Sequence, residues 1–171
     1  MDDARLTKFV EEVRQQCRFG LIAWQGLHTS LNGMDNERVF FYVHALLDHS
    51  RRVAGFLWSE NEALSETSTA LREGLKVPES SDLKHPDLEH FAGANETQFD
   101  RWLNSLSHLH FLPMNVMPQG TMAEFQQDAF LRNLDPDLYV FHWYNRSIDL
   151  GQLVNALRQI DSLAESWLRR H

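Results

Sequence analysis

Hydrophobic residues recur at three- and four-residue steps along most of the chain, which predicts amphipathic α-helices rather than strands. In the first such stretch the apolar positions are Leu6, Val10, Val13, Cys17, Leu21, Trp24, Leu27 and Leu31. Asp2 or Asp3 would cap its start, and Asn32-Gly33 would end it. A second helix opens at Asp35-Asn36-Glu37. Because only a tight turn separates the two helices, we expect them to be antiparallel neighbours.

Three further helices follow the same periodicity. Ser59-Glu60-Asn61-Glu62 has the pattern of a capping box and predicts the start of a shorter helix. Pro86 is expected at the first position of the next helix, where its missing N–H costs nothing. Gly93 weakens the middle of that helix, so we expect a bend or a break there. Asp149 with Gln152 predicts the start of the last helix.

The pattern changes ahead of the last helix. Two short runs, 129–134 and 138–144, are separated by Asp135-Pro136-Asp137, and the second run is rich in aromatic and β-branched residues. This composition predicts a β-hairpin over about 129–144. The expected fold is therefore mainly α: an up-and-down bundle of four or five helices, with a small β-hairpin inserted before the last helix. We expect a single domain over 1–171.

Charge and cysteine content narrow the function classes. Lys plus Arg number 16 and Asp plus Glu number 24, which gives a formal net charge of −8. This balance disfavours sequence-independent binding to DNA or to anionic membranes. The single cysteine excludes an intrachain disulfide and favours a reducing compartment. The acidic start Met1-Asp2-Asp3 does not resemble a signal peptide, so we expect a cytoplasmic protein with no membrane contact.

Histidine spacing gives a weak indication of a metal site. His108 and His110 would point the same way on a strand, and His142 lies on the predicted hairpin. Three such histidines could bind zinc, but a two-residue spacing often arises by chance. On the second helix, Asp48 and Arg52 are four residues apart and are expected to pair on the surface. We expect no cofactor.

The segment from Asp82 to Phe91 concentrates side chains that could do chemistry. It places a cation, Lys84, and two histidines, His85 and His90, around one predicted helix start, together with the carboxylates Asp87 and Glu89. A histidine can exchange a proton with a ribose 2′-OH or with a leaving oxygen near neutral pH. A lysine could stabilise the phosphate. These groups would suffice for a metal-free ribonuclease, although a capped helix start with exposed charges has the same pattern.

At this segment the sequence resembles the HEPN superfamily. His90 matches the histidine of the family motif, His85 its polar position and Lys84 its cationic position, and the stretches 88–91 and 99–102 look like an uncharacterised bacterial branch. The resemblance implies a bundle of four or five helices that dimerises, and in active members it implies cleavage of RNA without a metal. The motif departs from the family where lysine replaces the usual arginine, because lysine lacks the guanidinium fork that grips two phosphate oxygens.

Three functions therefore stay open. The first is a HEPN-like binding or assembly module, a homodimer with a protein or RNA partner. The second is a metal-independent ribonuclease that uses Lys84, His85, Glu89 and His90. The third is a zinc-dependent bundle enzyme that uses His108, His110 and His142.

Overall fold

The computed structural model describes residues 3–92, 96–105, 112–118, 121, 130–143 and 146–171. Over these residues the chain is mainly helical, with six α-helices and a four-stranded sheet that precedes the last helix. The predicted fold class is confirmed.

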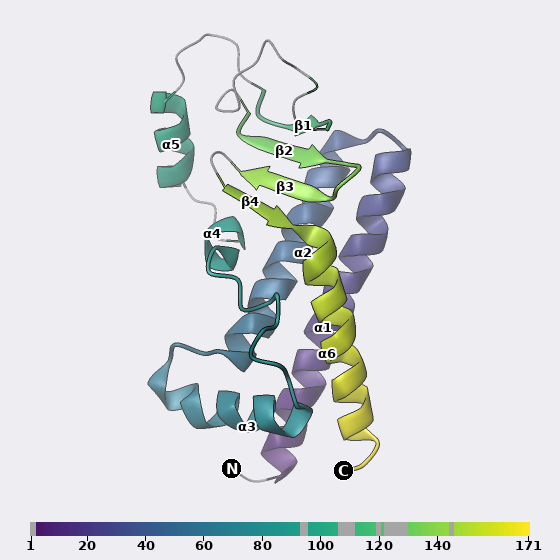
Figure 1. Ribbon diagram of the computed structural model, residues 1–171, viewed down its shortest axis with the longest axis vertical. Coiled ribbons are helices and arrows are strands. Elements are labelled where there is room, and N and C mark those ends of the chain that lie inside the picture. The colour runs from purple at the N-terminus through teal and green to yellow at the C-terminus, as the bar shows by residue number, and fades with distance from the viewer. Residues whose placement is uncertain (1–2, 93–95, 106–111, 119–120, 122–129, 144–145) are drawn as a thin grey trace.

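Three long helices lie side by side and form the body of the molecule (Figure 1). They are α1 (Asp3–Asn32), α2 (Asn36–Leu57) and α6 (Leu150–Leu168). The tight turn between α1 and α2 makes them antiparallel, as predicted. Met34 adopts a left-handed φ of 52° in that turn, and the Asp35 side chain accepts a hydrogen bond from the Arg38 N–H. The chain termini lie close together at one end of the bundle.

The predicted apolar stripes form the core between these helices. Fully buried side chains from the three helices include Val13, Cys17, Leu27, Val43, Leu46, Leu47, Val53, Leu150, Leu157 and Ala164. Burial raises the pKa of the Cys17 thiol far above its usual value, so this cysteine is a packed, unreactive side chain.

The helix α3 (Ser65–Leu75) lies across the end of the bundle that carries both termini (Figure 1). The predicted capping box before it is wrong. The Ser59 hydroxyl accepts from the Asn61 N–H, and the Asn61 side chain accepts from the Ala63 N–H. Asn61 therefore caps a short 3-10 turn over Glu62–Leu64, which leads into the helix.

Two short helices replace the single helix predicted from Pro86 onward. They are α4 (Leu88–Ala92) and α5 (Glu96–Ser105), and the residues around Gly93 lie outside the described ranges. The predicted position of Pro86 is wrong, because α4 begins two residues later. The Leu88 N–H bonds to the His85 carbonyl, so Pro86 lies in a turn that precedes the helix.

The sheet has the strand order β1-β2-β3-β4. Its strands are β1 (Asn115–Val116), β2 (Arg132–Asp135), β3 (Val140–Trp143) and β4 (Arg146–Asp149). The predicted hairpin corresponds to β2 and β3, which pair antiparallel with Asp135 opposite Val140. The Asp135 side chain accepts from the N–H groups of Asp137 and Leu138, which is the turn chemistry expected there. The hairpin is extended by β4, antiparallel to β3, and by β1, parallel to β2.

Aromatic side chains attach the sheet to α2 and α4. Phe141 is fully buried, and its ring lies 6.2 Å from that of Phe40 on α2 and 5.9 Å from that of Phe91 on α4. At the end of β4, the Asp149 side chain accepts from the Gln152 N–H, so the predicted cap of the last helix is confirmed. The contacts of Phe141 thus hold the sheet against both α2 and α4.

Candidate functional site

A groove of about 540 Å³ lies between the C-terminal half of α2 and the segment 83–89. One wall includes Arg51 and Gly55 of α2 and Trp58, the residue that follows the helix. The opposite wall includes Lys84, His85, Pro86 and Glu89. A Cβ added at Gly55 would meet no atom within 4 Å, so the space beside this glycine is open. A volume of this size is within the range of sites that hold small ligands or single side chains of a partner.

Three of the four predicted catalytic residues meet at this groove, and the fourth does not. Lys84, His85 and Glu89 line it, whereas His90 is not among its lining residues. His90 is half-buried on α4, and its ring lies 5.7 Å from that of Phe91. Burial lowers the pKa of His90.

Lys84 forms an ion pair within the chain. Its ammonium Nζ donates to the Glu79 carboxylate at 2.8 Å. This hydrogen bond and the charge of Lys84 hold the pKa of Glu79 below its usual value. A phosphate at the groove would have to compete with this carboxylate for the lysine.

The His85 side chain forms a hydrogen bond to the backbone just before α4. Its Nδ1 accepts a hydrogen bond from the Asp87 N–H at 3.1 Å. The imidazole therefore accepts a backbone N–H near the start of α4, as an Asn or Asp side chain usually does at a helix N-terminus. This bond uses the Nδ1 lone pair, so Nδ1 cannot also act as a proton acceptor for a substrate.

Asp87 also holds this segment, through its side chain. Its carboxylate forms an ion pair with the guanidinium of Arg146 on β4. The Asp87 carbonyl meanwhile accepts from the Phe91 N–H, one turn into α4. The Asp87 carboxylate is thus paired with an arginine of the sheet.

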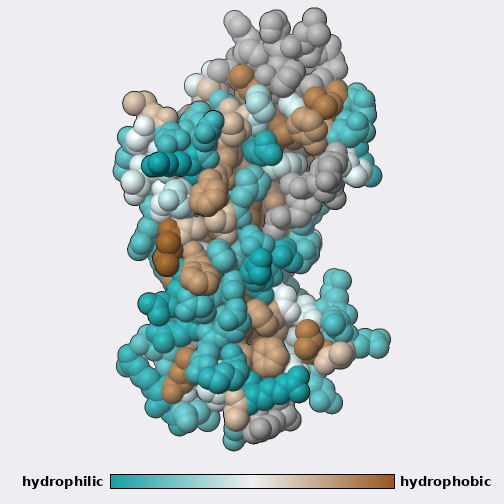
Figure 2. Space-filling view, turned by 180° about the vertical axis from the view of Figure 1, so that it is seen from behind, coloured by the Kyte–Doolittle hydropathy of each residue, from teal (hydrophilic) through white to brown (hydrophobic). Residues whose placement is uncertain are grey.

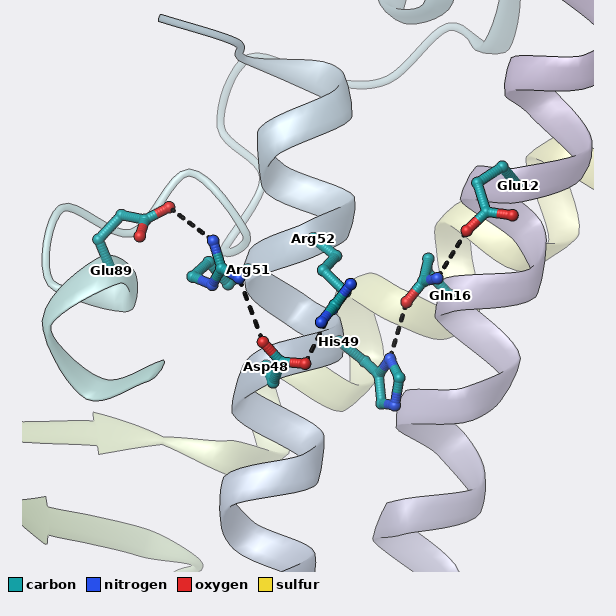
Figure 3. Close-up of polar contacts among 7 residues, drawn as sticks. All are labelled: Glu12, Gln16, Asp48, His49, Arg51, Arg52 and Glu89. Carbon is teal, nitrogen blue, oxygen red and sulfur yellow. Dashed lines mark hydrogen bonds and ion pairs between the residues drawn. The ribbon is translucent and has the colours of Figure 1, made fainter. Parts of the chain in front are cut away.

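A row of alternating charges joins α4 to α2 (Figure 3). Glu89 lies 3.6 Å from Arg51, whose guanidinium also lies 3.2 Å from Asp48, and Asp48 accepts from Arg52 at 2.8 Å. The predicted pair of Asp48 with Arg52 is confirmed. Burial disfavours the ionised Asp48, but hydrogen bonds from both arginines outweigh it and lower the pKa of this carboxyl. Two cations face two carboxylates, so the row is neutral as a whole.

The histidine next to these arginines points the other way. His49 Nδ1 donates to the Gln16 side-chain oxygen on α1 at 2.7 Å, and Gln16 donates in turn to Glu12 at 2.6 Å (Figure 3). Burial lowers the pKa of His49, although the charge of Asp48 opposes this effect. His49 therefore helps to join α2 to α1 and does not line the groove.

Sequence reasoning missed the α2 wall of the groove. Arg51, Gly55 and Trp58 are spaced by four and three residues, so they share one face of the predicted helix. That spacing could have identified the wall, but nothing in the sequence indicated which segment would lie opposite.

The zinc alternative has only one of its three ligands in the described part of the chain. His142 is buried on β3, where burial lowers its pKa while Asp135 opposes the shift. His108 and His110 lie outside the described residues. Among the residues that are described, no three His, Cys, Asp or Glu side chains lie close enough to hold a metal ion. Within the same part of the chain, no helix has both the length and the apolar character needed to cross a bilayer.

Comparison with models of protein families, with curated proteins and with solved structures finds no match. Membership of the HEPN superfamily therefore stays a prediction, carried by the residues 84–91 and 99–102.

Proposed function

We propose that this chain is a HEPN-like binding module whose groove receives a segment of a partner protein, and that it is not a ribonuclease. One observation carries the proposal: the charged groups of the predicted catalytic corner are already paired within the chain. Lys84 is held by Glu79, and Glu89 is held by Arg51. A ribonuclease would need its cation directed at the phosphate of the substrate.

The position of His90 also argues against cleavage. A general acid or base acts only within hydrogen-bond reach of the substrate that the cation grips. Lys84 lines the groove and His90 does not. In the ribonuclease alternative, one RNA phosphate would have to reach both side chains at once.

The charges at the groove favour a polypeptide over a nucleic acid. Arg51 and Lys84 are matched there by Glu60 and Glu89, and the chain as a whole carries −8. A polyanion such as RNA gains little binding free energy from a groove whose charges cancel on a protein of negative net charge. A polypeptide segment with charges of both signs complements these four charged side chains. One of its apolar side chains fills the space beside Gly55, between Trp58 and Pro86.

A substitution that fills the groove tests this proposal. Gly55→Leu places a side chain into open space on a helix, where leucine is also the better helix former. Gln25→Leu is the matched control, because Gln25 is exposed on α1 and does not line the groove. The probes are peptides selected from a phage-displayed random library against the wild-type chain, and circular dichroism checks that both variants fold.

We expect the selected peptides to bind the wild type and Gln25→Leu equally and to bind Gly55→Leu at least about 10-fold more weakly, which corresponds to about 1.4 kcal/mol. Equal binding to Gly55→Leu would place the binding surface elsewhere and overturn the proposal. So would the failure of every selected peptide to bind the wild type.

A further inference from the structure

An arginine of the sheet, Arg132, is half-buried, and no carboxylate lies beside it in the described part of the chain. Charged side chains are seldom buried unless they are paired. Exposed apolar side chains are less informative, because Figure 2 shows hydrophobic residues among hydrophilic ones on the face opposite to that of Figure 1, as is usual for soluble proteins. The unbalanced charge of Arg132 is therefore the stronger indication of a ligand outside the groove.

The pairing of three strands fixes the surroundings of Arg132. At the end of the sheet where β2 begins (Figure 1), Arg132 lies opposite Trp143 on β3, and Trp143 lies opposite Arg146 on β4. Directly opposite residues project from the same face of a sheet, so the tryptophan has an arginine on each side. Phe141, two residues before Trp143, shares this face and packs against α2, so the row of three is turned towards the helices.

The two arginines of this row differ in what balances their charge. Arg146 is paired with the Asp87 carboxylate. Arg132 has no ion pair or hydrogen bond with another described residue, and its guanidinium lies over the Trp143 ring, with Cζ 4.5 Å from the ring centroid. Burial lowers the pKa of Arg132, and no carboxylate among the described residues opposes this shift. The guanidinium stays protonated, so its N–H donors lack an anionic acceptor.

The indole N–H beside this guanidinium also lacks an acceptor. Trp143 is 3% exposed, and its buried Nε1–H bonds to no described residue. A buried indole N–H normally has a hydrogen-bond partner, because burial takes away its bonds to water. His44 of α2 lies beside the same ring, with 5.5 Å between ring centroids, and burial together with the charge of Arg132 lowers its pKa to about 4. The imidazole is therefore neutral near pH 7, and the single positive charge beside Trp143 is that of Arg132.

We propose that Arg132 and Trp143 bind the carboxylate group of a small organic acid, whose oxygens accept hydrogen bonds from the guanidinium and from the indole N–H. A guanidinium can grip two oxygens at once. Its single charge favours a carboxylate over a phosphate monoester, which carries about −1.5 to −2 near pH 7 and is repelled more strongly by a chain of net charge −8. Because Trp143 is buried, the ligand must be small. Neither residue lines the groove, so the inference does not depend on the proposed function.

The indole N–H resonance of Trp143 in NMR spectra of the isotope-labelled full chain tests this site directly, and Trp143→Phe identifies the resonance by its loss. Sodium acetate is the probe, with sodium chloride at equal ionic strength as the reference. In the wild type, acetate but not chloride is expected to shift this resonance until the site is saturated. Arg132→Gln is expected to bind acetate at least about 10-fold more weakly. Arg158→Gln is the matched control, because Arg158 is exposed on α6, and it is expected to bind acetate as the wild type does.

A Trp143 resonance that acetate leaves unshifted, or shifts equally in Arg132→Gln, would overturn the proposal. Arg132→Lys keeps the charge but loses the planar fork, so weaker acetate binding is expected from this variant too, and unchanged binding would mean that the fork does not grip the carboxylate. Sodium phosphate is the third probe. Tighter binding of phosphate than of acetate would overturn the assignment to a carboxylate. The spread of the backbone amide resonances shows whether each variant folds.

Discussion

Arg146 on β4 forms an ion pair with Asp87, the residue just before α4, across a sequence separation of 59 residues. On its other side, the same segment is held by the pair of Glu89 with Arg51 on α2. The wall of the groove that carries Lys84 and His85 is thus attached both to the sheet and to the long helix. A binding groove benefits from such a fixed wall, because less conformational entropy is lost when a ligand binds.

The Asp87–Arg146 pair is expected to contribute modestly to stability. The two side chains are 30% and 44% exposed, so water screens much of their attraction. We expect Asp87→Asn and Arg146→Gln each to lower the free energy of unfolding by about 0.5 to 1 kcal/mol. In a double-mutant cycle measured by urea denaturation, the two changes should be less than additive. Fully additive losses would mean that the pair does not form in solution.

His44 is expected to make the stability of the protein fall as the pH is lowered. Burial beside Phe141 and Trp143, together with the nearby charge of Arg132, lowers the pKa of His44 to about 4. The unfolded chain takes up this proton at about pH 6.5, before the folded chain does. The stability that depends on neutral His44 is therefore present above about pH 6.5 and is lost as the pH falls towards 4.

The complete loss, reached below about pH 4, amounts to roughly 3 kcal/mol. Urea denaturation of the wild type at about pH 7 and about pH 5 should show part of this decrease, and His44→Gln should show a smaller decrease over the same interval. An equal decrease in both proteins would mean that His44 does not cause it.

Two helix glycines are expected to respond in opposite directions to alanine. A Cβ at Gly26 would clash with the Tyr42 ring of α2, whereas a Cβ at Gly55 would meet nothing within 4 Å. Gly55→Ala should therefore stabilise the fold by up to about 1 kcal/mol through helix propensity. Gly26→Ala should instead destabilise the fold by roughly 1 to 2 kcal/mol, because the Tyr42 ring must move. Equal stabilisation of both variants in thermal melts would contradict the close contact of α1 with α2.

The local elements of this fold could be predicted from the sequence because their signals are local. Apolar periodicity gave the long helices, and Asp35 and Asp149 cap α2 and α6 as their side-chain chemistry predicts. The turn between β2 and β3 follows from Asp135, whose carboxylate accepts two backbone N–H groups. Each of these contacts spans three residues or fewer.

The arrangement at the candidate site could not be predicted in the same way. Lys84, His85 and Glu89 were chosen for their chemistry, but their partners decide what they do. The His85 side chain accepts a hydrogen bond from the Asp87 backbone N–H in its own turn, a capping role that its chemistry did not suggest. Glu89 meets Arg51 from another helix, and nothing along the chain specifies that contact. The strand β4 was also missed, because it has only four residues and three of them, Arg146, Ser147 and Asp149, are polar.

Cleavage of RNA in the presence of a chelator is the measurement that tests the central claim most directly. The wild-type chain and His90→Ala are incubated with a labelled single-stranded RNA, and the products are separated by gel electrophoresis. Because Lys84 is paired with Glu79 and His90 does not line the groove, we expect both proteins to leave the RNA as intact as buffer alone does. Cleavage by the wild type that His90→Ala abolishes would contradict the account and establish the ribonuclease.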